Sequence, residues 1–116
     1  MGYELHITRA AHWTENETAP ISLKEWGDYV AADPEMRMDN FAEATMAQGD
    51  TIRIEEEGIA VWTAYSGHGI GGNMAWFRHW RGEITVKNPD REIIDKMKQI
   101  AEVLGARVMG DEGELY

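Results

Sequence analysis

Hydrophobic and polar residues alternate at the start of the chain, as they do in a strand with one buried face. In residues 3–8, Tyr3, Leu5 and Ile7 fall on one side and polar residues on the other. This pattern predicts a half-buried strand. Strand-like character marks four later segments, at residues 51–66, 73–80, 82–87 and 106–110.

A helix is predicted to begin near residue 22. Ser22 and Glu25 form an S-x-x-E capping box, in which each side chain satisfies a free backbone amide of the first turn. Pro34 marks the end, because the residue before a proline resists helical angles. The apolar face of this helix comprises Leu23, Trp26 and Val30.

A second helix is predicted after Asn88-Pro89-Asp90, with the proline at or near the first helical position. Gly105 suits the left-handed residue that closes a helix. One apolar stripe runs along it, made of Ile93, Met97, Ile100 and Leu104.

The segments between these elements carry weaker signals. Residues 12–20 are polar and predict a loop, and residues 35–50 are ambiguous, with a short helical turn expected before Gly49. The element order is then β-α-β-β-β-α-β. It predicts a single α+β domain over residues 1–116, with a mostly antiparallel sheet of about five strands and two helices.

Charge narrows the range of partners. Of the 21 acidic residues, 13 lie in residues 1–57 beside only four basic ones, and the net charge is −10. Such a field opposes nucleic acid and anionic membranes and favours a basic protein partner, although solubility alone also explains it. The absence of cysteine, of a secretory signal and of a long apolar run predicts a cytoplasmic protein with no membrane segment.

The glycine pattern Gly67-x-Gly69-x-x-Gly72 resembles a nucleotide-binding fingerprint. That fingerprint needs a crossover helix directly after the glycines. Here only nine residues, rich in aromatics, separate Gly72 from Gly82. We therefore interpret the segment as the tip of a β-hairpin and expect no nucleotide cofactor.

The histidines do not form a recognisable metal or catalytic motif. None shows the HxH, HxxxH or HExxH spacing that places two imidazoles on one metal, and Ser66 does not lie in a nucleophile elbow. We expect neither a metal site nor a cofactor. One alternative stays open, a small enzyme or ligand-binding domain that uses His6, His68 or His79 as acid–base groups in a pocket.

A surface that binds another protein would account for most of these features. Exposed aromatic residues anchor protein interfaces, and charge sets their rate and specificity. A second alternative is a homo-oligomer, such as a homodimer, that buries exposed tryptophans between copies. The candidate residues for binding a partner are Asp50, Glu55, Glu56, Glu57, His68, Trp76 and Trp80.

Five segments of the chain resemble a family of small acidic bacterial proteins that carries no established activity. They are YELHITRAAHW, ISLKEWGDYVAADPEMR, AVWTAYSGHG, WFRHWRGEITVKNPD and MKQIAEVLGARVMGDEGELY. In size and charge, such proteins resemble the immunity partners of polymorphic, contact-dependent or type VI effector toxins. The resemblance implies a non-catalytic inhibitor that occludes its cognate toxin.

Overall fold

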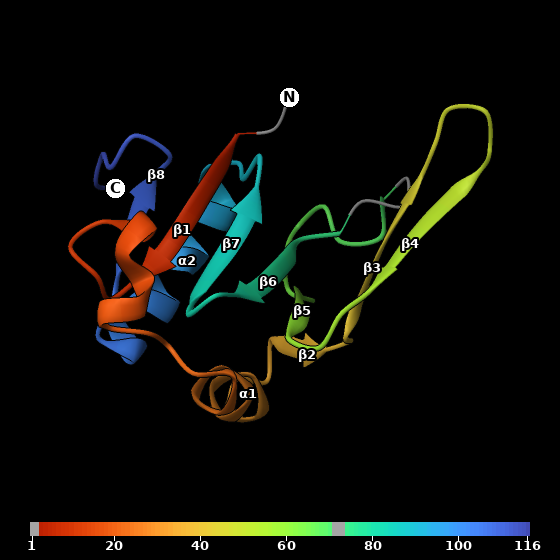
Figure 1. Ribbon diagram of the computed structural model, residues 1–116. Helices are drawn as coiled ribbons and strands as arrows, with labels where there is room; N and C mark the ends of the chain where they lie inside the picture. The colour runs from red at the N-terminus through yellow and green to blue at the C-terminus, as the bar shows by residue number, and fades with distance from the viewer. Residues whose placement is uncertain (1–2, 71–73) are drawn as a thin grey trace.

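The computed structural model describes residues 3–70 and 74–116. Their elements are β1 (Glu4–Thr8), η1 (a 3-10 helix, Trp13–Thr18), α1 (Leu23–Ala32), β2 (Met36–Met38), β3 (Phe41–Thr45), β4 (Thr51–Glu55), β5 (Ile59–Trp62), β6 (Trp76–Trp80), β7 (Glu83–Lys87), α2 (Arg91–Leu104) and β8 (Arg107–Gly110). Six strands form one antiparallel sheet in the order β2-β5-β6-β7-β1-β8 (Figure 1). The α+β class and the mostly antiparallel sheet are confirmed.

Strands β3 and β4 form a separate two-stranded sheet, which we call the ribbon (Figure 1). It projects away from the six-stranded sheet. The short helical turn expected before Gly49 is wrong, because residues 41–45 pair in register with residues 51–55. Gly58 then separates β4 from β5, with φ +97° and with His79 and Leu23 each 3.0 Å from where a Cβ would lie. The predicted strand-like segment 51–66 is therefore two strands in two different sheets.

Both helices pack on one face of the six-stranded sheet and enclose the core. Trp26 of α1 is fully buried there, and its indole N–H donates a hydrogen bond to the Gly58 carbonyl at 2.8 Å. The predicted stripe of α2 is also buried. Strands contribute the facing side chains, namely Leu5, Ile7, Ala60, Trp62, Phe77, Ile84, Val86 and Val108.

The helix ends follow the predicted chemistry closely. The capping box of Ser22 and Glu25 is formed, and Gly105 adopts left-handed angles at the end of α2. Asp90 is the N-cap of α2, so Pro89 precedes the cap instead of occupying the first helical position. The buried Lys96 of α2 binds Asp33 at 2.8 Å and Glu35 at 3.1 Å, which ties α2 to the segment after α1.

Strand β1 lies between β7 and β8 and pairs with both. These are the two strands that α2 connects in sequence. Residues after β8 fold back along its other edge, where Tyr116 N–H donates to the Val108 carbonyl at 3.0 Å. Both faces of β1 are buried, with His6 and Thr8 exposed by 2% and 0%. The prediction of a half-buried strand was wrong for this reason.

Two further expectations concern loops. The predicted polar loop at residues 12–20 contains η1, whose Asn16 is buried against β1 and β7. The glycine-rich connection between β5 and β6 occupies the expected place of a hairpin tip, but Gly72 lies outside the described residues. Within residues 3–70 and 74–116, no helix has the length and apolar character needed to cross a membrane.

Candidate functional site: the ribbon and the outer face of the sheet

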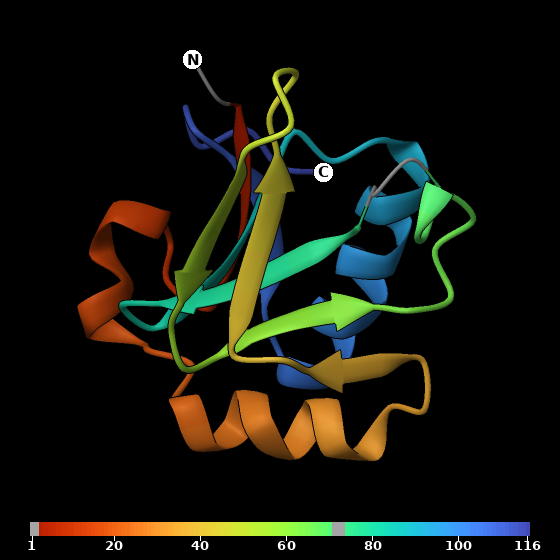
Figure 2. The same cartoon turned by 90° about the vertical axis from the view of Figure 1, so that its right-hand side faces the viewer.

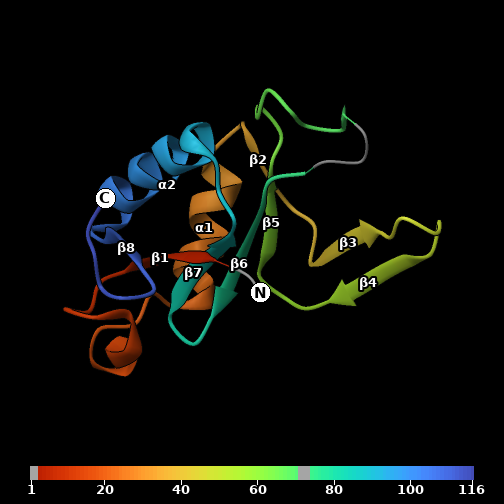
Figure 3. The ribbon, with the colours of Figure 1, turned by 90° about the horizontal axis from the view of Figure 1, so that it is seen from above.

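The face of the six-stranded sheet opposite the helices, which we call the outer face, is only partly covered. Alternation along β6 places Trp76, Arg78 and Trp80 on it, while Phe77 faces the core. One end lies beneath η1 and the segment after β8, and the ribbon rises from the other end (Figures 1 and 3). The outer face is therefore open mainly over β6, because Glu83 and Thr85 of β7 are buried.

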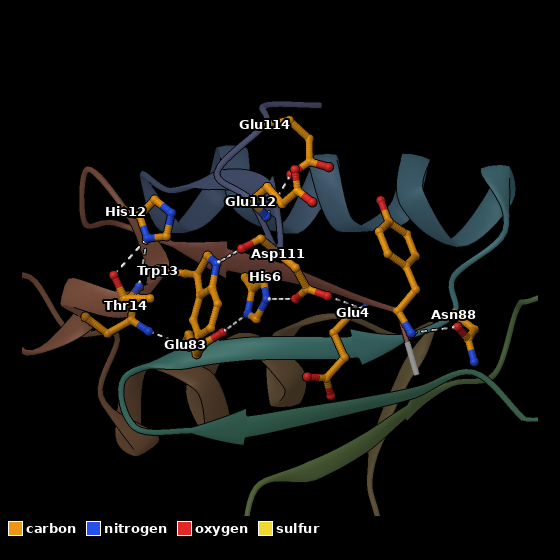
Figure 4. A network of polar contacts seen from close by, with 12 residues as sticks. Glu4, His6, His12, Trp13, Thr14, Glu83, Asn88, Asp111, Glu112 and Glu114 are labelled. Carbon is orange, nitrogen blue, oxygen red and sulfur yellow. Dashed lines mark hydrogen bonds and ion pairs between the residues drawn. The ribbon is translucent and has the colours of Figure 1, made fainter. Parts of the chain in front are cut away.

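A buried polar network closes the covered end. His6 lies between two carboxylates: Nδ1 contacts Glu83, and Nε2 is 2.8 Å from Asp111 (Figure 4). Its ring stacks on Trp13 with centroids 4.2 Å apart, and the Trp13 indole N–H donates to the Asp111 carbonyl at 3.0 Å. Asn16 donates to the second oxygen of Glu83. This network fastens η1 and the segment after β8 to the sheet.

The titration of His6 gives a testable pH dependence. Burial by itself would lower its pKa, but hydrogen bonds and charge from Glu83 and Asp111 outweigh burial and raise the pKa above its ordinary value of 6.5. The resulting stabilisation is complete below the unfolded pKa, about 6.5, and is lost as pH rises through the folded pKa. As pH rises through the folded pKa of His6, we expect the free energy of unfolding of the wild type to fall relative to that of His6→Gln. Urea unfolding at a series of pH values measures this difference. Parallel profiles of the two proteins would contradict this.

The ribbon has one charged face and one aliphatic face. On the charged face, Arg53 binds Glu43 at 3.2 Å and Glu55 at 2.9 Å. On the aliphatic face, Ile52 and Ile54 are 52% and 57% exposed. A two-stranded sheet is at best marginally stable alone, and exposed aliphatic side chains grouped together mark binding surfaces. The ribbon therefore has the character of a surface that another molecule covers.

A groove of about 240 Å³ lies between the aliphatic face of the ribbon and the outer face of the sheet. The guanidinium of Arg78 on its wall binds Glu56 through two nitrogens, at 2.6 and 2.9 Å, and this pairing lowers the pKa of Glu56. Residues that line the groove are Ala42 and Ile54 from the ribbon with Glu4, Ile59, Trp76, Arg78, Thr85 and Lys87 from the sheet.

No family model, curated protein or solved structure matches this chain. Function therefore rests on its own residues and on where the fold places them. Over residues 39–57, which span the ribbon, six acidic residues accompany one basic residue, Arg53. Six of the 13 acidic residues in residues 1–57 therefore lie on the ribbon or directly beside it.

The acidic residues predicted to bind a partner lie on or beside the ribbon. Asp50 is exposed next to its turn, Glu55 is exposed at the end of β4, and Glu57 is exposed directly after it. Glu56 differs, because it is half-buried in its pair with Arg78. Three of these four carboxylates are therefore exposed toward solvent.

The remaining predicted residues are divided between two places. Trp76 and Trp80 share the outer face, where Trp76 contacts Phe41 of the ribbon and Trp80 is 42% exposed beneath the guanidinium of Arg78. His68 lies in the connection after β5, where its amide donates to the Tyr65 carbonyl at 2.9 Å. Its Nδ1 is buried without a hydrogen-bond partner in the described part of the chain. The structure does not place His68 in the groove.

Two of the three histidines of the enzyme alternative, His6 and His79, are engaged in structural contacts. Both ring nitrogens of His6 contact carboxylates, and His79 Nε2 is 2.7 Å from the Ile21 carbonyl. In the described ranges, no group of three His, Asp or Glu side chains could hold a metal ion.

Sequence reasoning missed the two isoleucines of the ribbon, because alternating aliphatic residues predict a buried face. The small residues of 41–45 could have identified them. Ala42 lies opposite Ile54, and an alanine side chain is too small to bury an isoleucine.

Proposed function

We propose that the protein is a non-catalytic cytoplasmic binding protein that neutralises a basic toxin domain by occluding it, as immunity proteins do. The observation that carries this proposal is the ribbon, which has two glutamates and one arginine on one face and isoleucines on the other, and is exposed along the whole of β4. Apolar contact supplies most of the energy of such an interface, whereas charge steers association and rejects wrong partners.

The outer face adds a second part to the same surface. Trp80 offers an exposed aromatic ring held by Arg78 and Arg81, whose guanidinium carbons lie 4.4 and 5.2 Å from the ring centroid. Tryptophan and arginine are the residues most enriched among binding hot spots. A partner that contacts the ribbon, the groove and Trp80 covers the open part of the sheet.

The contacts of His6 and His79 favour binding over acid–base catalysis by these two residues. A general base needs a ring nitrogen within reach of a substrate proton, and His6 and His79 direct theirs at groups of the protein itself. Their contacts support the fold that presents the ribbon.

The direct test uses the gene beside the one that encodes this protein. The C-terminal domain of the neighbouring product is expressed in cells with and without this protein, and growth is measured. We expect toxicity to be abolished, and calorimetry to show a one-to-one complex that weakens with added salt. Unchanged toxicity with this protein in excess, or no complex at low salt, would contradict the proposal.

Charge reversal on the ribbon is a sharper test of where that partner binds. The double variant Glu55→Lys and Glu57→Lys is expected to slow association about tenfold or more at low salt, because it removes local steering by negative charge. The matched control is Asp95→Lys and Glu102→Lys on the exposed face of α2, which makes the same change in net charge away from the ribbon. Equal slowing by both variants would show that only the overall charge matters.

A further inference from the structure

The hydrogen bonds at the two ends of the ribbon define which backbone groups point outward. Glu56 N–H donates to the Asn40 carbonyl at 3.0 Å, and Met46 N–H donates to the Asp50 carbonyl at 2.6 Å. Hydrogen-bonded pairs alternate with non-bonded pairs in an antiparallel ladder. Ile52 and Ile54 therefore use their amides within the ribbon, whereas Thr51, Arg53 and Glu55 direct theirs to the free edge of β4.

Among the strand edges of residues 3–70 and 74–116, the free edge of β4 is long and exposed along its length. Strand β3 lies between β4 and the connection that follows β5, so its edge faces the rest of the chain (Figures 2 and 3). In the six-stranded sheet, β2 is only three residues long, and β8 is covered by its own following segment through the Met109–Leu115 bridge. An exposed strand edge is a template on which another strand can pair.

We propose that an extended segment of a basic partner protein adds to β4 as a third strand of the ribbon. This proposal rests on the proposed function, since it gives the binding mode for the same surface. The register assigns the chemistry of the segment: aliphatic side chains would continue the face of Ile52 and Ile54 toward the groove. On the other face, lysine or arginine in the segment would lie beside Glu55 at the end of β4, whereas Arg53 in the middle of β4 already pairs with Glu43 and Glu55.

Charge decides against a second copy of this chain as the occupant. Pairing β4 with another β4 would bring together two ribbons that each carry six acidic residues and one basic residue over residues 39–57, in molecules of net charge −10. Repulsion between two molecules of this overall charge opposes such pairing. A basic strand instead adds opposite charge at the same positions.

The first experiment uses a capped peptide of alternating lysine and valine as the probe, with alternating glutamate and valine as its control. Amide hydrogen exchange is followed by NMR on the whole protein. We expect the lysine peptide to slow exchange at Thr51, Arg53 and Glu55, and the glutamate peptide to leave it unchanged. No slowing at these amides with the lysine peptide overturns the proposal. Slow exchange there without peptide, together with a dimer by light scattering, would favour a second copy and also overturn it.

The second experiment uses two matched proline variants. Thr51 and Thr45 face each other across the ribbon, and neither amide is used in the ladder. Thr51→Pro removes an outward N–H from the β4 edge, and Thr45→Pro does so on β3, so each ribbon keeps its pairing. We expect Thr51→Pro to weaken peptide binding about tenfold or more and Thr45→Pro to leave it unchanged. Equal effects from both variants would overturn addition at β4.

The toxin domain separates this inference from the proposed function. If that domain binds but exchange at Thr51, Arg53 and Glu55 stays fast, strand addition is wrong while neutralisation by occlusion stands. If the peptide protects these amides but the neighbouring domain never binds, the edge site stands and the proposed function is wrong.

Discussion

Replacing Glu83 with alanine is expected to destabilise the protein by about 3–5 kcal/mol, because it breaks a buried ion pair by removing one partner. Glu83 is 4% exposed, and its two oxygens contact His6 and Asn16. Without it, the Asn16 amide and one nitrogen of His6 would be buried and unpaired. Urea unfolding at about pH 6 measures the loss, since the His6 ring is charged there.

Two variants control this measurement. Glu83→Gln keeps the shape and one acceptor, so we expect a smaller loss; it also provides a reading if Glu83→Ala does not fold. Glu102→Ala removes an exposed glutamate from α2 and should change stability by no more than about 0.5 kcal/mol. If Glu83→Ala and Glu102→Ala are equally stable, the network contributes nothing to the fold.

Trp26→Ala is the second variant with a large expected effect, also about 3–5 kcal/mol, because it opens a cavity in the core. The ring is fully buried, stacks on Tyr29 with centroids 6.0 Å apart, and donates to the Gly58 carbonyl. Gly58 immediately precedes β5, so the substitution removes a contact at the place where α1 meets the base of the ribbon. Thermal and urea unfolding measure it.

The matched control is Trp80→Ala, which removes the same ring from the outer face. Trp80 is 42% exposed and contacts chiefly two arginines, so its removal should cost about 1 kcal/mol or less. A loss at Trp80 as large as that at Trp26 would mean that the outer face is part of the folding core.

Local signals predicted the parts of the fold that depend on neighbours in sequence. The capping box, the stripe of α2 and the left-handed Gly105 are each determined within a few residues, and all three are present. Residues 41–45 have a helix-like composition, with two alanines and a glutamate. They form a strand because residues 51–55 pair with them, and tertiary pairing overrides weak intrinsic preference.

In the candidate site, the sequence correctly predicted only those residues whose exposure can be inferred from their own charge. The run Glu55–Glu57 was expected on a surface, and its two outer members are exposed. Glu56 is held instead by Arg78, which is 22 residues away in sequence. In the same way, burial of His6 depends on Glu83 and Asp111, whose proximity comes from the strand order and not from any local pattern.

The place of β1 between β7 and β8 also constrains how the protein is made. Its four residues from Glu4 to Ile7 pair with residues 84–87, and those from Leu5 to Thr8 pair with residues 107–110. During synthesis, the first strand therefore has neither neighbour until most of the chain has been translated. Such long-range pairing slows folding and leaves strand edges open meanwhile. The acidic residues 1–57 are synthesised before residues 58–116, and repulsion between their like charges favours solubility over that interval.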